Sequence, residues 1–106
     1  MTDPSRVTLT RGSLYIRRAV YDCHFAGLET VMLLRRDDDL LILPVRHAAA
    51  GGFLLKFRNI VGDRVVNAPD FFRAQGIEDH ISRELSVTWA TDDAALIASG
   101  IFAMRT

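Results

Sequence analysis

The sequence predicts one β-rich α+β domain over residues 1–106, built from two related halves. Three observations lead to this prediction: strand-like alternation recurs along the chain, only two short stretches have helical spacing, and the same order of patterns occurs twice. With 106 residues, 49% of them hydrophobic and 25% charged, the chain suffices for one compact core and is too short for two. The halves, residues 7–45 and 53–98 with a joint at 46–52, must therefore share that core.

The first half begins with two predicted strands. Val7 and Leu9 alternate with threonines, the alternation changes phase at Gly12, and Leu14 and Ile16 resume it. Gly12 is therefore expected in a turn or bulge.

A short helix is predicted over residues 18–26. Its spacing puts Val20, Cys23 and either Phe25 or Ala26 on a common side, and Gly27 permits the left-handed exit that ends helices. Cys23 is accordingly expected to be a small core residue.

A hairpin is predicted from two apolar runs, residues 29–34 and 40–45, separated by Arg35, Arg36 and Asp37–Asp39. Both runs are nearly continuous, which favours cover on two faces, as in a small barrel or an intertwined dimer. The charged tip is expected to be solvated, and Pro44 is expected to end its strand or lie at an edge.

The second half repeats this order. Residues 53–57 alternate like a strand, 62–77 predict a strand, a turn and a short helix ended by Gly76, and 78–83 predict a polar connection. Leu85, Val87 and Trp89 give the clearest strand alternation, and an aspartate turn leads into a last strand over residues 94–98.

The repetition has a measurable spacing. Gly12 and Gly62 are 50 residues apart, Gly27 and Gly76 are 49 apart, and Asp37 and Asp92 are 55 apart, so the insertion falls at residues 78–83. One such unit cannot bury a two-sided hairpin alone. Two units can do so by exchanging hairpins around a pseudo-twofold axis.

The segment VTLTRGSLYIRRAVYDCHFAGLETVMLLRRDDDLLILPV, residues 7–45, resembles the swapped-hairpin barrel unit of the AbrB, MazE and MraZ group of bacterial DNA-binding proteins. The second half is similar to a weaker degree, as in the tandem arrangement of MraZ proteins. The chain departs from the group's pattern because Arg17 stands where a proline usually follows the isoleucine. Ser13 also stands where a basic residue usually follows the glycine.

The resemblance implies a transcriptional regulator or antitoxin-like protein that binds DNA through basic residues of the strand-to-helix segments. Guanidinium groups neutralise phosphates and read guanine edges, and twelve of the thirteen basic residues are arginine. The residues so implied are Arg11, Arg17, Arg18, Lys56, Arg58 and Arg64.

An alternative remains open, in which these side chains only solvate strand faces. The chain is then a non-catalytic module that binds protein or a small ligand on the same scaffold. Adjacent Phe71 and Phe72 cannot both point inward from one short helix, so one of them is expected to be exposed or covered by a partner chain. Charge distribution separates the two hypotheses, since a DNA-binding protein should gather its arginines on one face.

No catalytic constellation, cofactor motif or metal-ligand spacing is found in the sequence, so we expect neither an enzyme nor a cofactor. Cys23 and His24 are adjacent and diverge by about 100° on a helix, and Asp37–Asp39 lack the spacing of a calcium loop. His47 and His80 lack ligand spacing.

Overall charge and cysteine content limit the classes of partner and the cellular compartment that the sequence allows. Thirteen basic and thirteen acidic residues cancel, so a polyanion would have to be bound by a local patch. A single cysteine, no signal pattern and no apolar run of membrane-spanning length predict a soluble cytoplasmic protein. A homo-oligomer is the expected assembly.

Overall fold

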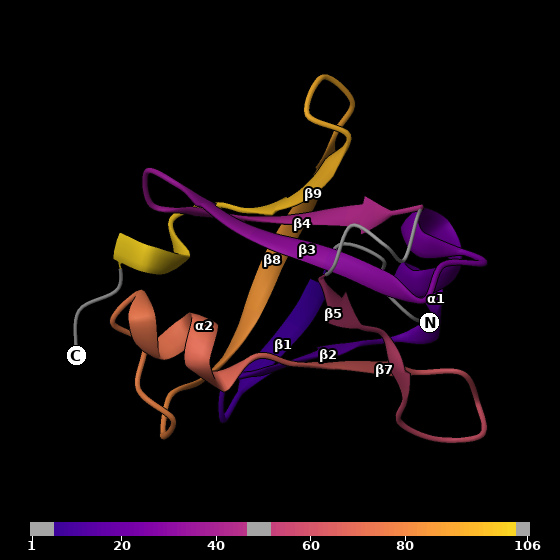
Figure 1. Cartoon of the computed structure of the whole chain (residues 1–106), viewed down its shortest axis with the longest axis horizontal. Helices are drawn as coiled ribbons and strands as arrows, with labels where there is room; N and C mark the ends of the chain where they lie inside the picture. The colour runs from indigo at the N-terminus through magenta and orange to yellow at the C-terminus, as the bar shows by residue number, and fades with distance from the viewer. Residues whose placement is uncertain (1–5, 47–51, 104–106) are drawn as a thin grey trace.

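The computed structural model describes residues 6–46 and 52–103, and within them the chain forms one antiparallel sheet that curls into a nearly closed barrel (Figure 1). The strand order is β5-β3-β4-β9-β8-β1-β2-β7-β6. Helical segments are few and short. The prediction of a β-rich fold with few helices is confirmed.

The first half supplies four strands and one helical segment between them. Its elements are β1 (Arg6–Thr10), β2 (Ser13–Ile16), α1 (Arg18–Val20), which runs directly into the π-helical turn η1 (Tyr21–Phe25), β3 (Thr30–Arg36) and β4 (Asp39–Val45).

The second half follows with short strands, one helix and a long hairpin. Its elements are β5 (Phe53–Leu54), β6 (Lys56–Phe57), β7 (Arg64–Asn67), α2 (Pro69–Ala74), β8 (Ser82–Ala90), β9 (Ala95–Ala98) and the 3-10 turn η3 (Ile101–Ala103). Of the predicted joint at 46–52, residues 47–51 lie outside the described residues.

The barrel closes at Leu55. The sequence predicts one strand over residues 53–57, but this segment bends at Leu55, so that β5 pairs with β3 and β6 pairs with β7. Leu55 is buried, and its N–H donates to the carbonyl of Glu29 at 2.7 Å. The bend lets one segment join the two edges of the sheet, which reduces the number of unpaired backbone groups there.

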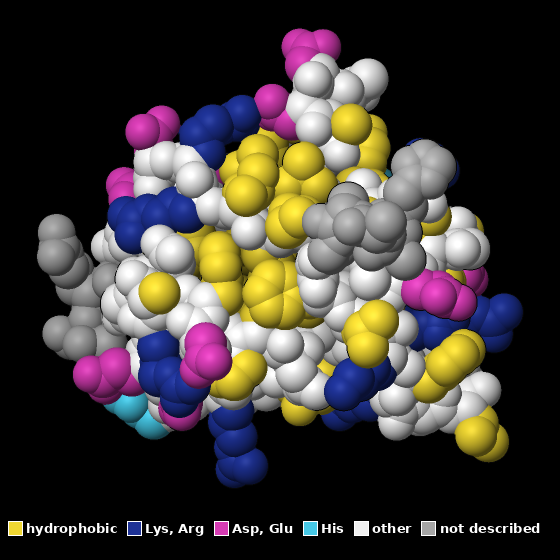
Figure 2. All heavy atoms as spheres, viewed as in Figure 1, with side chains coloured by type: hydrophobic (Ala, Val, Ile, Leu, Met, Phe, Trp, Pro, Cys, Tyr) yellow, Lys and Arg dark blue, Asp and Glu magenta, His cyan; other side chains and the backbone are white. Residues whose placement is uncertain are grey.

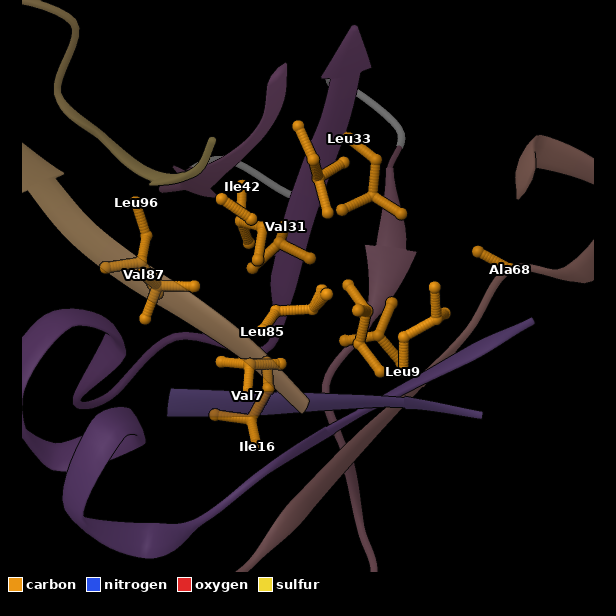
Figure 3. Close-up of a cluster of buried hydrophobic side chains, with 14 of the residues drawn as sticks. Val7, Leu9, Ile16, Val31, Leu33, Ile42, Ala68, Leu85, Val87 and Leu96 are labelled. Atoms are coloured by element: carbon orange, nitrogen blue, oxygen red, sulfur yellow. The ribbon is translucent and has the colours of Figure 1, made fainter. Parts of the chain in front are cut away.

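The core lies inside the barrel, where alternate residues of most strands meet (Figure 3). Val7 of β1 lies opposite Leu85 of β8, and Leu9 and Val87 are buried in the same core, so the predicted alternation is the one that buries apolar side chains. The two helices cover opposite ends of the barrel. β2 and β7 run antiparallel, so the helix that follows β2 (α1) and the helix that follows β7 (α2) lie at opposite ends. Phe25 of η1 and Phe72 of α2 are both fully buried.

The expectation that Cys23 lies in the core is wrong. Cys23 is exposed, and the buried residues of this segment are Val20, Tyr21 and Phe25. Residues 21–25 form a π-helical turn, which is wider than the α-helix that the spacing argument assumed. The wider turn directs Tyr21 and Phe25 inward and carries Cys23 to the surface.

Pro44 was expected to end its strand or lie at an edge. It lies in the part of β4 that has a neighbouring strand on one side only. β4 pairs with β9 only over Leu40–Ile42, so Pro44 lies beyond that ladder and opposes Val31 of β3 alone. A residue without an N–H is tolerated there because no neighbour on the other side requires one.

The turn between β1 and β2 packs against the start of α2. Gly12 has φ +75°, and a Cβ added to it would lie 2.5 Å from Pro69 Cα. The N–H of Ala68 donates to the Gly12 carbonyl at 3.0 Å. Gly12 is therefore required both for its left-handed conformation and for its lack of a side chain.

We predict that Gly12→Ala destabilises the protein by more than Gly27→Ala. Gly27 has φ +80° but nothing within 4 Å of an added Cβ, so its substitution costs only the left-handed strain, about 1–2 kcal/mol. Gly12→Ala adds overpacking against Pro69, on the order of 1–3 kcal/mol more. Urea unfolding of the two variants measures the difference, and equal destabilisation would contradict the close approach to Pro69.

Candidate nucleic-acid interface

The loop between β6 and β7 is held in one conformation by its own hydrogen bonds. The N–H of Arg58 donates to the Asp63 carbonyl at 2.8 Å, and the Asn59 amide donates to Asp63 Oδ2 at 3.0 Å. The N–H of Asp63 in turn donates to Asn59 Oδ1 at 3.2 Å. These bonds close the base of the loop and leave Ile60 and Val61 at its exposed tip.

Asp63 also ties this loop to the first helix. Its Oδ1 accepts a hydrogen bond from the N–H of Arg18 at 2.8 Å, at the start of α1. The bonds from Asn59 and from Arg18, together with the charges of Arg58 and Arg17, lower the pKa of Asp63. The ionised carboxylate therefore joins the loop to the start of α1.

Two guanidinium groups lie on aromatic rings beside the loop. Arg64 is sandwiched, with its Cζ 3.6 Å from the ring centroid of Phe57 and 4.0 Å from that of Tyr21. Arg58 lies 4.5 Å over the ring of Tyr15. Such stacking fixes flexible side chains while their outer N–H groups stay free to donate.

The Nε of Arg64 is buried and has no hydrogen-bond partner within the described part of the chain. A buried donor without a partner is uncommon and carries a desolvation penalty. The side chain is nevertheless held in place by the two rings. We interpret it as a positioned cation.

The arginines line two shallow depressions on either side of Val61. Arg17, Arg18 and Arg58 border one of about 460 Å³, together with Ala19 and Asp63. Arg18 and Arg64 border the other, of about 310 Å³, and its remaining lining is Tyr21, Asp22, Phe57, Ile60 and Gly62. Four of the six predicted basic residues thus meet in one place, which we call the arginine surface.

Charges on the arginine surface are only partly compensated. Arg18 pairs with Asp22 at 3.2 Å in an exposed pair of the kind that contributes little to stability. In the described ranges, no ion pair involves Arg17, Arg58 or Arg64. Cations therefore exceed carboxylates locally although the whole chain has no net charge.

The other two predicted residues lie apart from this centre. Lys56 is exposed on the outer side of β6, opposite Val65, in the same cross-strand row as Tyr15. Arg11 is in the β1–β2 turn, at the opposite end of β2 from Arg17. Arg11 is therefore not part of the arginine surface.

Sequence reasoning did not single out Ile60, Val61, Tyr15 or Tyr21. The signal for the loop was an Asn-Ile-Val-Gly-Asp run, in which two β-branched apolar residues stand inside a turn pattern. The aromatic partners had no local signal, because Tyr15 and Tyr21 meet Arg58 and Arg64 only through the pairing of β2 with β7.

A second surface feature is the outer face of β5, β3, β4 and β9. Cross-strand pairs set Met32 against Leu43, and Leu41 lies between Leu34 and Ile97. Leu34 is 46% exposed and Leu54 on β5 is 56% exposed. Figure 2 shows hydrophobic atoms gathered on this side of the molecule. We call Met32, Leu34, Leu41, Leu43, Leu54 and Ile97 the outer aliphatic face.

The opposite part of the same barrel has a polar exterior. Outward positions of β1 and of the part of β8 that pairs with it are occupied by polar side chains, including Thr8, Glu84 and Ser86. Half-buried antiparallel sheets normally have such polar outer positions. The outer aliphatic face is therefore a departure from the pattern of its own barrel.

The predicted partner-binding phenylalanines have different surroundings. Phe72 is fully buried in the core. Phe71 is half-buried at the rim, in edge-on contact with Phe53 and Phe102 at 6.4 Å each between ring centroids. Their adjacent positions on α2 thus direct one ring inward and the other toward the surface.

Residues considered for other chemistry are dispersed. His24 stacks on Trp89 at 5.1 Å between centroids, and burial lowers the pKa of its imidazole. At the hairpin tip, Arg35 pairs with Asp38 and Arg36 with Asp93. Within residues 6–46 and 52–103, no three potential metal ligands converge. No helix in those ranges is long and apolar enough to cross a membrane.

Comparison with known proteins identified no relative of this chain. No protein family, no curated protein and no solved structure matches the chain. The arrangement of the side chains therefore has to support any functional proposal.

Asp63→Asn tests the tie between the loop and α1. Because the pKa of the Asp63 carboxyl is lowered on folding, its ionised form contributes stability above the unfolded value near 4, and this contribution is lost as pH falls through the folded value. Asp63→Asn should be less stable than the parent protein at pH 7, and the difference should vanish at low pH.

Chemical unfolding between pH 7 and pH 2 measures this convergence. Asp92→Asn is the matched control, since it removes the same charge from the β8–β9 turn, far from the loop (Figure 1). A constant difference between Asp63→Asn and the parent across the pH range would contradict a role for the Asp63 charge.

Proposed function

We propose that the protein binds nucleic acid, with DNA as the expected partner, through the arginine surface, and acts as a transcriptional regulator or antitoxin-like protein. The observation that carries the proposal is the convergence of Arg17, Arg18, Arg58 and Arg64 around one ordered loop. Clustered guanidinium groups with free N–H donors suit phosphate contacts, which supply most of the affinity for nucleic acid.

The chain has no net charge, so binding of a polyanion depends on local clustering of its arginines. A chain with balanced charge attracts a polyanion only if its cations are gathered. Here the arginines converge on one end of the barrel, while several acidic groups elsewhere are occupied by ion pairs. The pairs of Asp93 with Arg36, and of Asp70 and Asp79 with Arg73, lie on other elements.

The proposal includes the resemblance to the AbrB, MazE and MraZ group. In this part of the proposal, the two halves are duplicated units that exchange hairpins. Both halves have the element order strand, strand, helix, strand, strand when the bent segment of β5 and β6 is counted as one strand. In this comparison β1 corresponds to β5, β2 to β7, β3 to β8 and β4 to β9. The pairing of β1 with β8 then corresponds to that of β5 with β3, and the pairings of β2 with β7 and of β4 with β9 each join two equivalent strands. These pairings support a pseudo-twofold relation between the halves.

Turn contacts support the duplication as well. The Gly12 turn packs on Pro69 at the start of α2, and the Gly62 turn packs on Arg18 at the start of α1. Gly27 and Gly76, which follow the two helices, both have positive φ. The positions that align in the sequence therefore make corresponding contacts.

The proposal predicts binding of a DNA oligonucleotide that weakens steeply as salt rises. Replacing both Arg17 and Arg58 by alanine should lower the slope of log K against log salt by about two, one for each guanidinium that no longer neutralises a phosphate. Arg11→Ala is the matched control because Arg11 lies at the other end of β2, and it should leave the slope unchanged.

Fluorescence anisotropy between 20 and 300 mM salt, values chosen to span roughly the range in which counterion release is measurable, gives these slopes. No binding at the lowest salt would end the proposal. An equal effect of Arg11→Ala would show that the attraction is diffuse and does not depend on the arginine surface.

A second candidate function is a non-catalytic interaction module, and the outer aliphatic face is the observation that favours it. We propose that a second copy of this chain binds to this face. The patch contains no charged side chain, the rim charges Arg36 and Asp93 pair within the chain, and the chain has no net charge to repel its copy. Twofold pairing would set this face against itself and cover it.

We predict that Leu34→Lys disrupts this homo-oligomer. Placing an ammonium group in an apolar interface should weaken self-association by at least about tenfold. Thr8→Lys, on the polar exterior of β1 between Glu84 and Tyr15, is the control and should have no effect. Sedimentation velocity measures the association, and a parent protein that is monomeric at high concentration would contradict the pairing.

A further inference from the structure

The tip of the β6–β7 loop exposes more apolar surface than a solvated turn requires. Ile60 is fully exposed, Val61 is more than half exposed, and Phe57 at the foot of the loop is 72% exposed. In Figure 2, hydrophobic atoms protrude at the lower right, where Figure 1 has this loop. Turns favour polar residues, so an apolar tip needs an explanation.

Hydrogen bonds hold the base of this apolar tip. The hydrogen bonds between Asn59 and Asp63 close the loop at its base, and Asp63 fixes it to the N–H of Arg18. These bonds constrain the backbone on both sides of Ile60 and Val61. A constrained apolar group loses less conformational entropy when a partner covers it.

Flat surfaces surround the tip. Phe57 has the Arg64 guanidinium on one face, and its large exposed fraction leaves the ring accessible. Arg58 covers Tyr15 and is itself exposed, so its guanidinium plane also faces outward. Aromatic rings and guanidinium planes are the surfaces on which unpaired bases stack.

Duplex and single-stranded nucleic acid differ in what they offer to such a surface. A duplex exposes phosphates and groove edges and keeps its base faces stacked, so apolar contact with those faces requires unstacking. An unpaired strand exposes phosphates and base faces together. The arginine surface combines cations with apolar and planar groups within one loop, which matches the unpaired strand.

We infer that the arginine surface takes unpaired nucleic acid in preference to duplex, with bases packed on Phe57, Ile60 and Val61 and phosphates held by Arg17, Arg18 and Arg58. This inference rests on the nucleic-acid binding in the proposed function and specifies the ligand of that binding. Contact with base faces is tolerant of sequence, because every base has a planar apolar face. The expected preference is therefore for strandedness, with little dependence on sequence.

An anionic membrane is a less suitable partner for the same loop. Phe57 cannot enter hydrocarbon without bringing the guanidinium of Arg64, which lies 3.6 Å from its ring centroid. Asp63, which stays ionised at the base of the loop, would be repelled by a negative surface. Vesicles nevertheless form one arm of the test.

The experiment compares a mixed-sequence oligonucleotide of roughly 15 nucleotides, within the site sizes of single-strand binders, with its blunt duplex at equal low salt. The single strand should bind at least about tenfold more tightly, the factor expected from one stacked base. Ile60→Ser combined with Val61→Ser should reduce single-strand affinity about tenfold and leave duplex affinity unchanged.

Leu54→Ser is the matched control, because Leu54 is a similarly exposed aliphatic residue on β5, outside the loop. Unfolding midpoints should be unchanged in both variants, since the replaced side chains lie on the surface. Phosphatidylserine vesicles should not compete with the oligonucleotide.

The outcomes separate the two levels of the proposal. Equal or tighter binding of duplex overturns the preference and leaves the proposed function intact. No binding of either form at low salt overturns the proposed function itself. Competition by vesicles that disappears in the Ile60→Ser, Val61→Ser variant assigns the tip to a lipid surface and overturns the inference.

Discussion

Two contacts, each between a turn of one half and the helix start of the other half, constrain how the rest of the molecule is arranged. The Gly12 turn lies against Pro69, where only a glycine leaves enough room, and Asp63 beside the Gly62 turn holds the N–H of Arg18. These contacts join segments about 50 residues apart and accompany the pairing of β2 with β7. With that pairing in place, the two helices lie at opposite ends and Leu55 can close the sheet.

The two turn–helix contacts are chemically different, and this difference defines the candidate site. At the α1 end, Arg17, Arg18, Arg58 and Arg64 converge with few acidic partners. At the α2 end, Arg73 pairs with both Asp70 and Asp79, so its charge is neutralised locally. Among the described residues, the arginines that converge are therefore at the α1 end of the barrel. Function is thus proposed to reside in the side chains of one contact and not in the fold itself.

Local signals predicted the elements well, and non-local contacts determined what the sequence could not predict. Gly76 ends α2 in the left-handed region, as its place after the helical stretch indicated. The bend at Leu55 has no local signal, because it arises from closing the barrel between β3 and β7. Cys23 was misplaced because a π-helical turn replaced the assumed α-helix.

The candidate site was predictable only in part for the same reason. Arginines beside strand ends marked Arg17, Arg18, Arg58 and Arg64 as candidates, yet their convergence depends on which strands pair. Arg11 has equivalent local surroundings in the sequence and lies at the wrong end of β2. The stacking of Arg64 between Tyr21 and Phe57 likewise joins three separate elements. Charge type is a property of the sequence, whereas a charged surface is a property of the strand register.

The central claim is that nucleic acid contacts the α1 end of the barrel. Backbone amide chemical shifts recorded during titration with an oligonucleotide test it residue by residue. We expect the largest changes on residues 17–21 and 57–64, with Arg11, α2 and the outer aliphatic face unperturbed. Changes centred on the outer aliphatic face, or on the Gly12 turn and α2, would contradict it.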